Sequence, residues 1–294
     1  MRWKRQLVGL PGNRAGDCSQ NCSCRLPTEY RGPGAIRPLT VCVVVLGRYV
    51  PQLAFLHILL GDEPVLAAEA QLYQRLLAMD PLEASTIVHE FLKGKQLVEL
   101  YDTVLIPALS MAEQDRHKGA IDAVREEFLF LSIHEMIAEF SEYAVRESEA
   151  RAAHRILCIP AHDQADEITA AMLAQLLEQK GFVTMSLPIA AASPNDMLAA
   201  VEAGPNDIVC ISSLPPYAFG PARGLCRQIR ERFPKLKVVV CVWGFSGDVE
   251  KAKERFERTQ PDRLCISLAG AVEYVQELVP RQREAAPLAL GSEA

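Results

Sequence analysis

The chain has 294 residues, is 49% hydrophobic and carries a formal net charge of −6, with a mean hydropathy near zero. This length allows one large or two smaller domains, and the apolar content is sufficient for a buried core. The charge is uneven, because residues 1–38 hold seven Arg or Lys against two acidic residues. The remaining acidic body has no long-range attraction for nucleic acid, which is therefore not an expected partner.

Residues 1–38 are rich in Arg, Gly, Pro and Asn without a period, which predicts a disordered basic tail, and residues 282–294 predict a second disordered tail. The opening MRWKRQ is not followed by the apolar core of a signal peptide. Four cysteines fall in separate apolar runs, a distribution that suits buried thiols in a reducing compartment: Cys158, Cys210, Cys241 and Cys265. A cytoplasmic location is expected.

Residues 39–60 form the most apolar stretch, which Arg48 and Pro51 divide. Neither part reaches the ~20 residues that a membrane-spanning helix needs. The stretch fits a core element or the remnant of a membrane helix, and Arg48 would then mark a cytoplasmic helix end.

Residues 61–150 predict a helical cap bundle of four amphipathic helices with short connections. Asp80 and Pro81 read as an N-cap followed by a proline in the first helical position. The third helix contains Pro107, which predicts a kink.

The hydrophobic pattern changes in residues 151–281, where five short apolar runs alternate with amphipathic helical stretches. This alternation predicts a flavodoxin-like, doubly wound α/β domain with a five-stranded parallel sheet in the order 2-1-3-4-5. Ligands of such sheets bind at the carboxyl ends of the strands. His162, the segment 212–216 and the segment 243–247 should converge there.

Three ligand chemistries of this fold are excluded by the turns between strands and helices. A phosphoacceptor receiver needs an aspartate after the third strand and a lysine after the fifth, and neither is present. Dinucleotide and flavin phosphates need a glycine-rich turn after the first strand, whereas this turn reads PAHDQAD.

The remaining pattern resembles the cobalamin-binding domain family, in which D-x-H-x-x-G follows the first strand, S-x-L ends the third and Gly-Gly ends the fourth. His162 stands at the ligand histidine, Ser212-Ser213-Leu214 matches S-x-L, and Gly244 matches the second glycine. The segment LYDTVLIPAL resembles the family's four-helix cap over the upper corrin face. The resemblance implies cobalamin as cofactor, with His162 as lower cobalt ligand and Ser212, Leu214 and Gly244 beside the corrinoid.

Several positions depart from the family pattern. Pro160 replaces the aspartate that hydrogen-bonds the ligand histidine, a loss that typically lowers metal affinity ~10–100-fold. Ala165 replaces the glycine of the motif, and Trp243 replaces the first glycine of the pair, where its ring could fill the nucleotide-tail pocket. In the cap, Arg116 and Glu127 stand where some sensor members carry Trp and His.

Residues 40–280 also resemble the cytoplasmic C-terminal region of autoinducer-2 exporter (PerM-like) permeases, through PLTVCVVVLGRYVPQLAFLHILLGDEPVL and LYQRLLAMD. That resemblance implies a fragment of a permease-like protein, lying near a membrane, with a permease or other protein as partner.

Two functions stay open. The first is a non-catalytic cytosolic regulatory or interaction module that keeps the corrinoid fold without a corrin. The second is a corrinoid sensor that binds cobalamin, or another small molecule, between cap and sheet. An enzyme is not expected, because a methyl carrier depends on the histidine–aspartate pair that Pro160 breaks.

Overall fold

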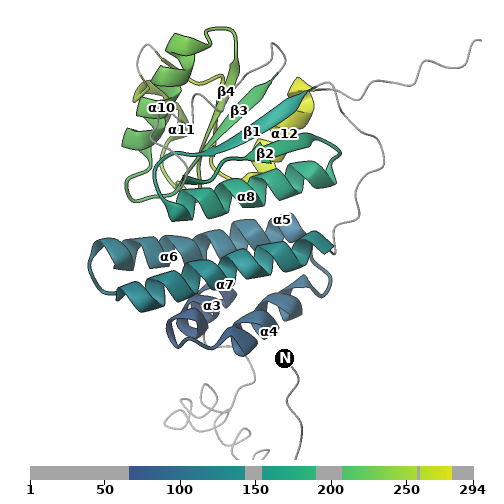
Figure 1. Cartoon of the computed structure of the whole chain (residues 1–294), viewed down its shortest axis with the longest axis vertical. Helices are drawn as coiled ribbons and strands as arrows, with labels where there is room; N and C mark the ends of the chain where they lie inside the picture. Colours follow the sequence, from purple (N-terminus) through teal and green to yellow (C-terminus); the bar gives the residue numbers. More distant parts are fainter. Residues whose placement is uncertain (1–65, 143–153, 190–206, 257–258, 280–294) are drawn as a thin grey trace, which may run out of the picture. The chain divides into compact units, whose positions relative to one another are not determined.

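The computed structural model describes residues 66–142, 154–189, 207–256 and 259–279, which form a helical cap followed by an α/β domain (Figure 1). The predicted tails and the apolar segment 39–60 lie outside these residues. Among the residues that the structure describes, no helix is both long and apolar enough to cross a membrane.

The cap contains four helical rods, as predicted. Its elements are α3 (Ala68–Leu77), α4 (Pro81–Leu92), α5 (Leu97–Leu100), η2 (Tyr101–Leu105), α6 (Ile106–His117) and α7 (Ala123–Glu142). Elements α5, η2 and α6 follow one another directly, so the π-helical turn η2 lies just before Pro107. Proline has no N–H to donate, so the regular helical hydrogen-bond pattern changes at this point.

The second part is a parallel five-stranded sheet in the order β2-β1-β3-β4-β5, which confirms the predicted fold class. Its elements are β1 (Arg155–Pro160), α8 (Gln164–Gln179), β2 (Val183–Ser186), β3 (Ile208–Ser213), α10 (Phe219–Arg232), β4 (Lys237–Val242), α11 (Val249–Glu254), β5 (Arg263–Cys265) and α12 (Leu268–Leu278).

Two apolar cores cover the two faces of the sheet. Alternate strand residues such as Leu157 and Ile159 pack under α10 and α11, whereas Cys158 and its neighbours face α8 and α12. The core on the α8 side continues without interruption into the cap, where it includes Leu105 and Leu109. In Figure 1, α8 accordingly lies between the sheet and cap helices α6 and α7. Cap and sheet therefore share one hydrophobic core.

Polar contacts reinforce this shared core. The carboxylate of Asp102 accepts hydrogen bonds from the backbone N–H groups of Leu268 (2.7 Å) and Ala269 (3.0 Å), so a cap residue satisfies the first turn of α12. The Tyr101 hydroxyl donates to Gln175 on α8, and the Gln175 amide donates to the Ile137 carbonyl at 2.8 Å.

Replacing Asp102 with alanine tests the contribution of this contact. Loss of a helix cap typically costs about 0.5–2 kcal/mol, so Asp102→Ala should lower the free energy of unfolding by about that amount. Urea unfolding followed by circular dichroism measures it. Glu135→Ala, which removes an exposed carboxylate on α7, is the matched control. Equal stability of the two variants would contradict the assigned role of Asp102.

Candidate functional site

The loop after β1 is fixed by two carboxylates. Asp163 caps α8, because its side chain accepts a hydrogen bond from the Asp166 N–H at 3.2 Å. Asp166 accepts bonds from the backbone N–H groups of His162 (3.0 Å) and Leu214 (2.6 Å). One buried carboxylate therefore ties the β1–α8 loop to the end of β3. Burial and the nearby charge of Asp163 raise the pKa of Asp166 well above its usual range, although the amide bonds oppose this shift.

His162 lies at the carboxyl end of the sheet, as the topology rule requires. It lines a cavity of about 120 Å³ together with His117, Asp163, Asp166, Leu214, Tyr217, Ala218 and Pro221. Pro160 is the last residue of β1, opposite Ser212, and offers no side-chain acceptor. Within the described parts of the chain, only the backbone N–H of His162 makes a hydrogen bond, so no carboxylate orients its imidazole ring.

The expected S-x-L segment is buried and hydrogen-bonded. The Ser212 hydroxyl lies 2.7 Å from the Thr169 hydroxyl and accepts a hydrogen bond from the indole N–H of Trp243 at 2.6 Å. Ser213 donates to the carbonyl of Ala218 at 2.8 Å. The hydroxyls of both serines therefore make hydrogen bonds that stabilise the end of β3.

Trp243 occupies the space between the strand ends and the cap. Its side chain is fully buried in the core that includes Leu268 and the cap residues. Gly244 follows with φ of +65°, a left-handed conformation that favours glycine, and its N–H donates to the Ile266 carbonyl at 3.0 Å. A Cβ at Gly244 would lie 3.9 Å from Ile106 of α6, so the cap reaches this edge of the sheet.

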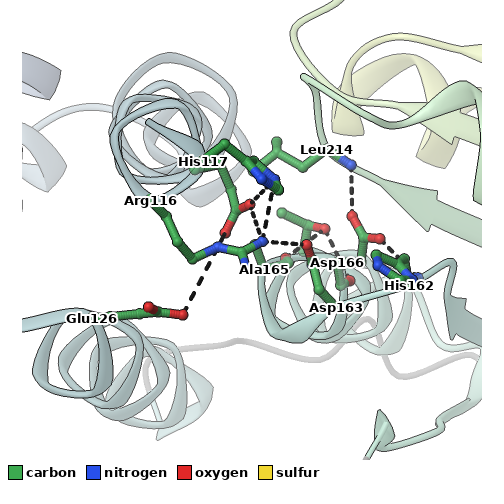
Figure 2. A network of polar contacts seen from close by, with 10 residues as sticks. Arg116, His117, Glu126, His162, Asp163, Ala165, Asp166 and Leu214 are labelled. Carbon is green, nitrogen blue, oxygen red and sulfur yellow. Dashed lines mark hydrogen bonds and ion pairs between the residues drawn. The ribbon is translucent and has the colours of Figure 1, made fainter. Parts of the chain in front are cut away.

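A network of ion pairs and hydrogen bonds centred on Arg116 lies at the same carboxyl edge of the sheet (Figure 2). The Arg116 Nη2 atom lies 2.6 Å from Glu113 Oε2 and 2.7 Å from Asp163 Oδ2, and Nε donates to Glu113 Oε1 at 3.0 Å. Burial raises the pKa of Glu113, which is only 2% exposed, although its hydrogen bonds to Arg116 oppose the shift. The network joins cap helix α6 to the first turn of α8.

His117 adds a second contact from α6 to the sheet edge. Its ring packs edge-on against Tyr217, with 4.7 Å between ring centroids, and its Nε2 lies 3.4 Å from Glu113 Oε2. Tyr217 belongs to the loop after β3, which has a cis peptide bond between Pro215 and Pro216. Glu127 lies elsewhere, on a surface pocket of about 210 Å³ between α7 and α8.

Among the described residues, one group of side chains has the spacing of metal ligands, with its ligand atoms within 4.8 Å of one another. It consists of Glu113, His117 and Asp163. The guanidinium of Arg116 lies between the two carboxylates and hydrogen-bonds both. The positive charge that balances this cluster therefore comes from the protein's own side chain.

These residues do not fit a corrin as they are arranged. Ligand sites for molecules of drug size usually measure about 300–1,000 Å³, whereas the cavities at His162 and beside Glu127 measure about 120 and 210 Å³. Core residues of the cap and of the sheet form one continuous cluster, and Trp243 is fully buried in it. A corrin could enter this edge only if the cap moved away from the sheet.

Sequence reasoning missed part of this site. From the sequence alone, Asp163 and Asp166 are explained as acidic residues in the first turn of a helix, and no pattern marks His117 as a site residue. Asp166 gains its second function from a backbone N–H that lies 48 residues away, and no local pattern signals such a partner. Glu113 and Arg116 are three residues apart on one helix, a spacing that predicts an ion pair on the helix surface. The sequence does not indicate that Asp163 is the third partner.

Comparison with known proteins relates the fold to corrinoid proteins. No protein-family model matches the sequence, and no curated protein matches it. A monomethylamine corrinoid protein of Methanosarcina barkeri superimposes with a TM-score of 0.52 at 12% identity, covering 71% of this chain and 96% of that one. A cobalamin-binding protein of Desulfitobacterium hafniense reaches a TM-score of 0.35 at 15% identity, covering 73% and 100% of the two chains. The first likeness shows that this chain has the fold of a corrinoid protein.

Replacing Arg116 tests the network. Arg116→Ala leaves the buried Glu113 without its guanidinium partner. Breaking a buried ion pair typically lowers the free energy of unfolding by about 3–5 kcal/mol. Because Arg116 is partly exposed, we expect a loss at or below the lower end of that range. A carboxyl with a raised pKa loses its burial cost when it is protonated, so the deficit should shrink as the pH falls from 7 toward 5.

Urea unfolding at several pH values measures this deficit. Arg125→Ala, which removes an exposed ion pair with Asp122, is the matched control and should change stability little at any pH. A pH-independent deficit in Arg116→Ala would show that Glu113 is not the group left uncompensated.

Proposed function

We propose that this chain is a non-catalytic regulatory or interaction module that has the corrinoid-protein fold and holds its cap on the sheet with its own side chains. The observation that carries the proposal is the fully buried indole of Trp243, which donates to Ser212. By the resemblance to the cobalamin-binding family, the nucleotide tail of the cofactor would lie there. A protein that takes up a large cofactor at this edge would have to remove that ring from the core, at a cost of about 3–5 kcal/mol if truncation to alanine is the guide.

The Arg116 network supports the same proposal. Asp163 would belong to the loop that carries the cobalt ligand, yet its carboxylate is bound by Arg116 of the cap. His162 also lacks the aspartate partner that would make its imidazole a stronger ligand, because Pro160 occupies that position. The loop is therefore organised for contact with the cap.

The two serines at the end of β3 are not assembled as nucleophiles, which supports a non-catalytic role. The Ser212 and Ser213 hydroxyls are buried in structural hydrogen bonds, and neither contacts a histidine. The partner that we propose is a permease-type membrane protein. That proposal rests on the resemblance of residues 40–280 to the C-terminal region of the permeases.

A corrinoid sensor is the second candidate, and one observation favours it. His162 lies on the loop after β1, at the carboxyl edge of the sheet, and lines a cavity with Leu214. Opening of the cap about its contacts with α8 and α12 would enlarge that cavity. Under this alternative, His162 is the lower cobalt ligand and cobalamin is the cofactor.

An absorbance titration of the full chain with hydroxocobalamin separates the two. We expect no shift of the visible bands and no co-elution of cobalamin on gel filtration. His162→Ala is the test variant, and His134→Ala, an exposed histidine on α7 beside the other pocket, is the matched control. A band shift that is lost in His162→Ala and kept in His134→Ala would overturn the proposal and establish the sensor.

A further inference from the structure

Four cysteines line one face of the sheet as two neighbouring pairs. All are free thiols in the core that faces α8 and α12. Cys158 on β1 lies opposite Cys210 on β3, and Cys241 on β4 lies opposite Cys265 on β5. The site and function described above use neither pair.

The Cys241–Cys265 pair has the spacing that a disulfide needs. Neighbouring strands lie about 4.7–4.9 Å apart, within the ~4.4–6.8 Å between Cα atoms found in disulfides. The two thiols also lie close enough for each to shift the pKa of the other. Cys265 ends β5, a three-residue strand at the edge of the described sheet, and is 6% exposed, whereas Cys158, Cys210 and Cys241 are fully buried. Short edge strands open locally more readily than central ones.

The two pairs also differ in chemistry. The neighbouring Cys241 thiol lowers the pKa of Cys265, and the charge of Arg263 acts in the same direction, although burial opposes both. The pKa of Cys210 is raised well above its usual value by the neighbouring Cys158 thiol and by burial. Because the thiolate is the reactive form of cysteine, Cys265 is a better nucleophile than Cys210.

We propose that Cys241 and Cys265 are a redox-sensitive dithiol that a hydroperoxide converts into a reversible disulfide between β4 and β5. The Cys265 sulfur attacks the peroxide oxygen and becomes a sulfenic acid, while the peroxide leaves as an alcohol or water. The Cys241 sulfur then attacks the sulfenic acid, the S–S bond forms, and water leaves. The two thiols lose two electrons and two protons, which the peroxide takes up, and an excess of thiol reverses the reaction.

The disulfide would act at the seam between cap and sheet. The residue after Cys265 accepts a hydrogen bond from Gly244, and Leu268 donates to Asp102 of the cap. A disulfide that fixes β5 to β4 would therefore lie next to the segment that holds Trp243 and to the first turn of α12. This inference goes beyond the proposed function and does not depend on it.

The test treats the reduced full-length chain with hydrogen peroxide, blocks the remaining thiols by alkylation, and maps disulfides by tryptic mass spectrometry. Cleavage after Lys237 and Arg263 releases Cys241 and Cys265 on separate peptides, 238–251 and 264–281. We expect these two peptides to appear linked, and dithiothreitol to release them. The link should disappear in Cys265→Ala and persist in Cys210→Ala, the matched control from the other pair.

Two outcomes would overturn the proposal. One is the absence of the 238–251 to 264–281 link while other cysteines of the same chain are oxidised. The other is equal linkage of Cys158 to Cys210, which would indicate general unfolding instead of a selective site. Circular dichroism before and after oxidation checks that the fold is retained.

Discussion

The buried carboxylate of Asp166 organises the edge of the sheet on which the site is built. It binds backbone N–H groups on two loops that approach from different strands, at His162 and Leu214. The β1–α8 loop therefore presents Asp163 to the cap in a fixed orientation, and Arg116 finds its partner there. Because the carboxylate is buried and close to a second acidic group, its raised pKa means that this order is maintained at an electrostatic cost. The amide bonds offset that cost.

Cap and α/β domain are held together by contacts of different character along their seam. On the α12 and α8 side, Asp102 and Gln175 make polar bonds inside a continuous apolar core. At the Arg116 end the contacts are charged and partly exposed. The first kind resists opening because it buries apolar surface, whereas the second is weakened by salt and by water. Any opening of the cap is therefore expected to begin at the Arg116 end, which is also where the His162 cavity lies.

Most of the fold could be predicted from the sequence, because strands buried on both faces read as continuous apolar runs and doubly wound sheets obey strict connection rules. The positions of His162 and Trp243 at the carboxyl edge follow from the same rules. The partners could not be predicted in this way. Asp166 binds the N–H group of the residue after β3, Arg116 of the cap binds Asp163, and Asp102 of the cap binds the first turn of α12. Each of these contacts joins residues that only the tertiary fold brings together, and their side chains have ordinary local explanations in the sequence.

The Asp102 contact also bears on how the chain reaches its folded state. It joins residues that are 166 positions apart, and the helix that it completes is the last described element. Contacts of such high sequence separation carry a large loop-closure entropy and raise the contact order, which slows folding. The first turn of α12 thus gains its full hydrogen bonding only after the cap has docked on the sheet. Folding of the α/β domain and docking of the cap are therefore coupled events, and the two parts behave as one cooperative unit although their architectures are distinct.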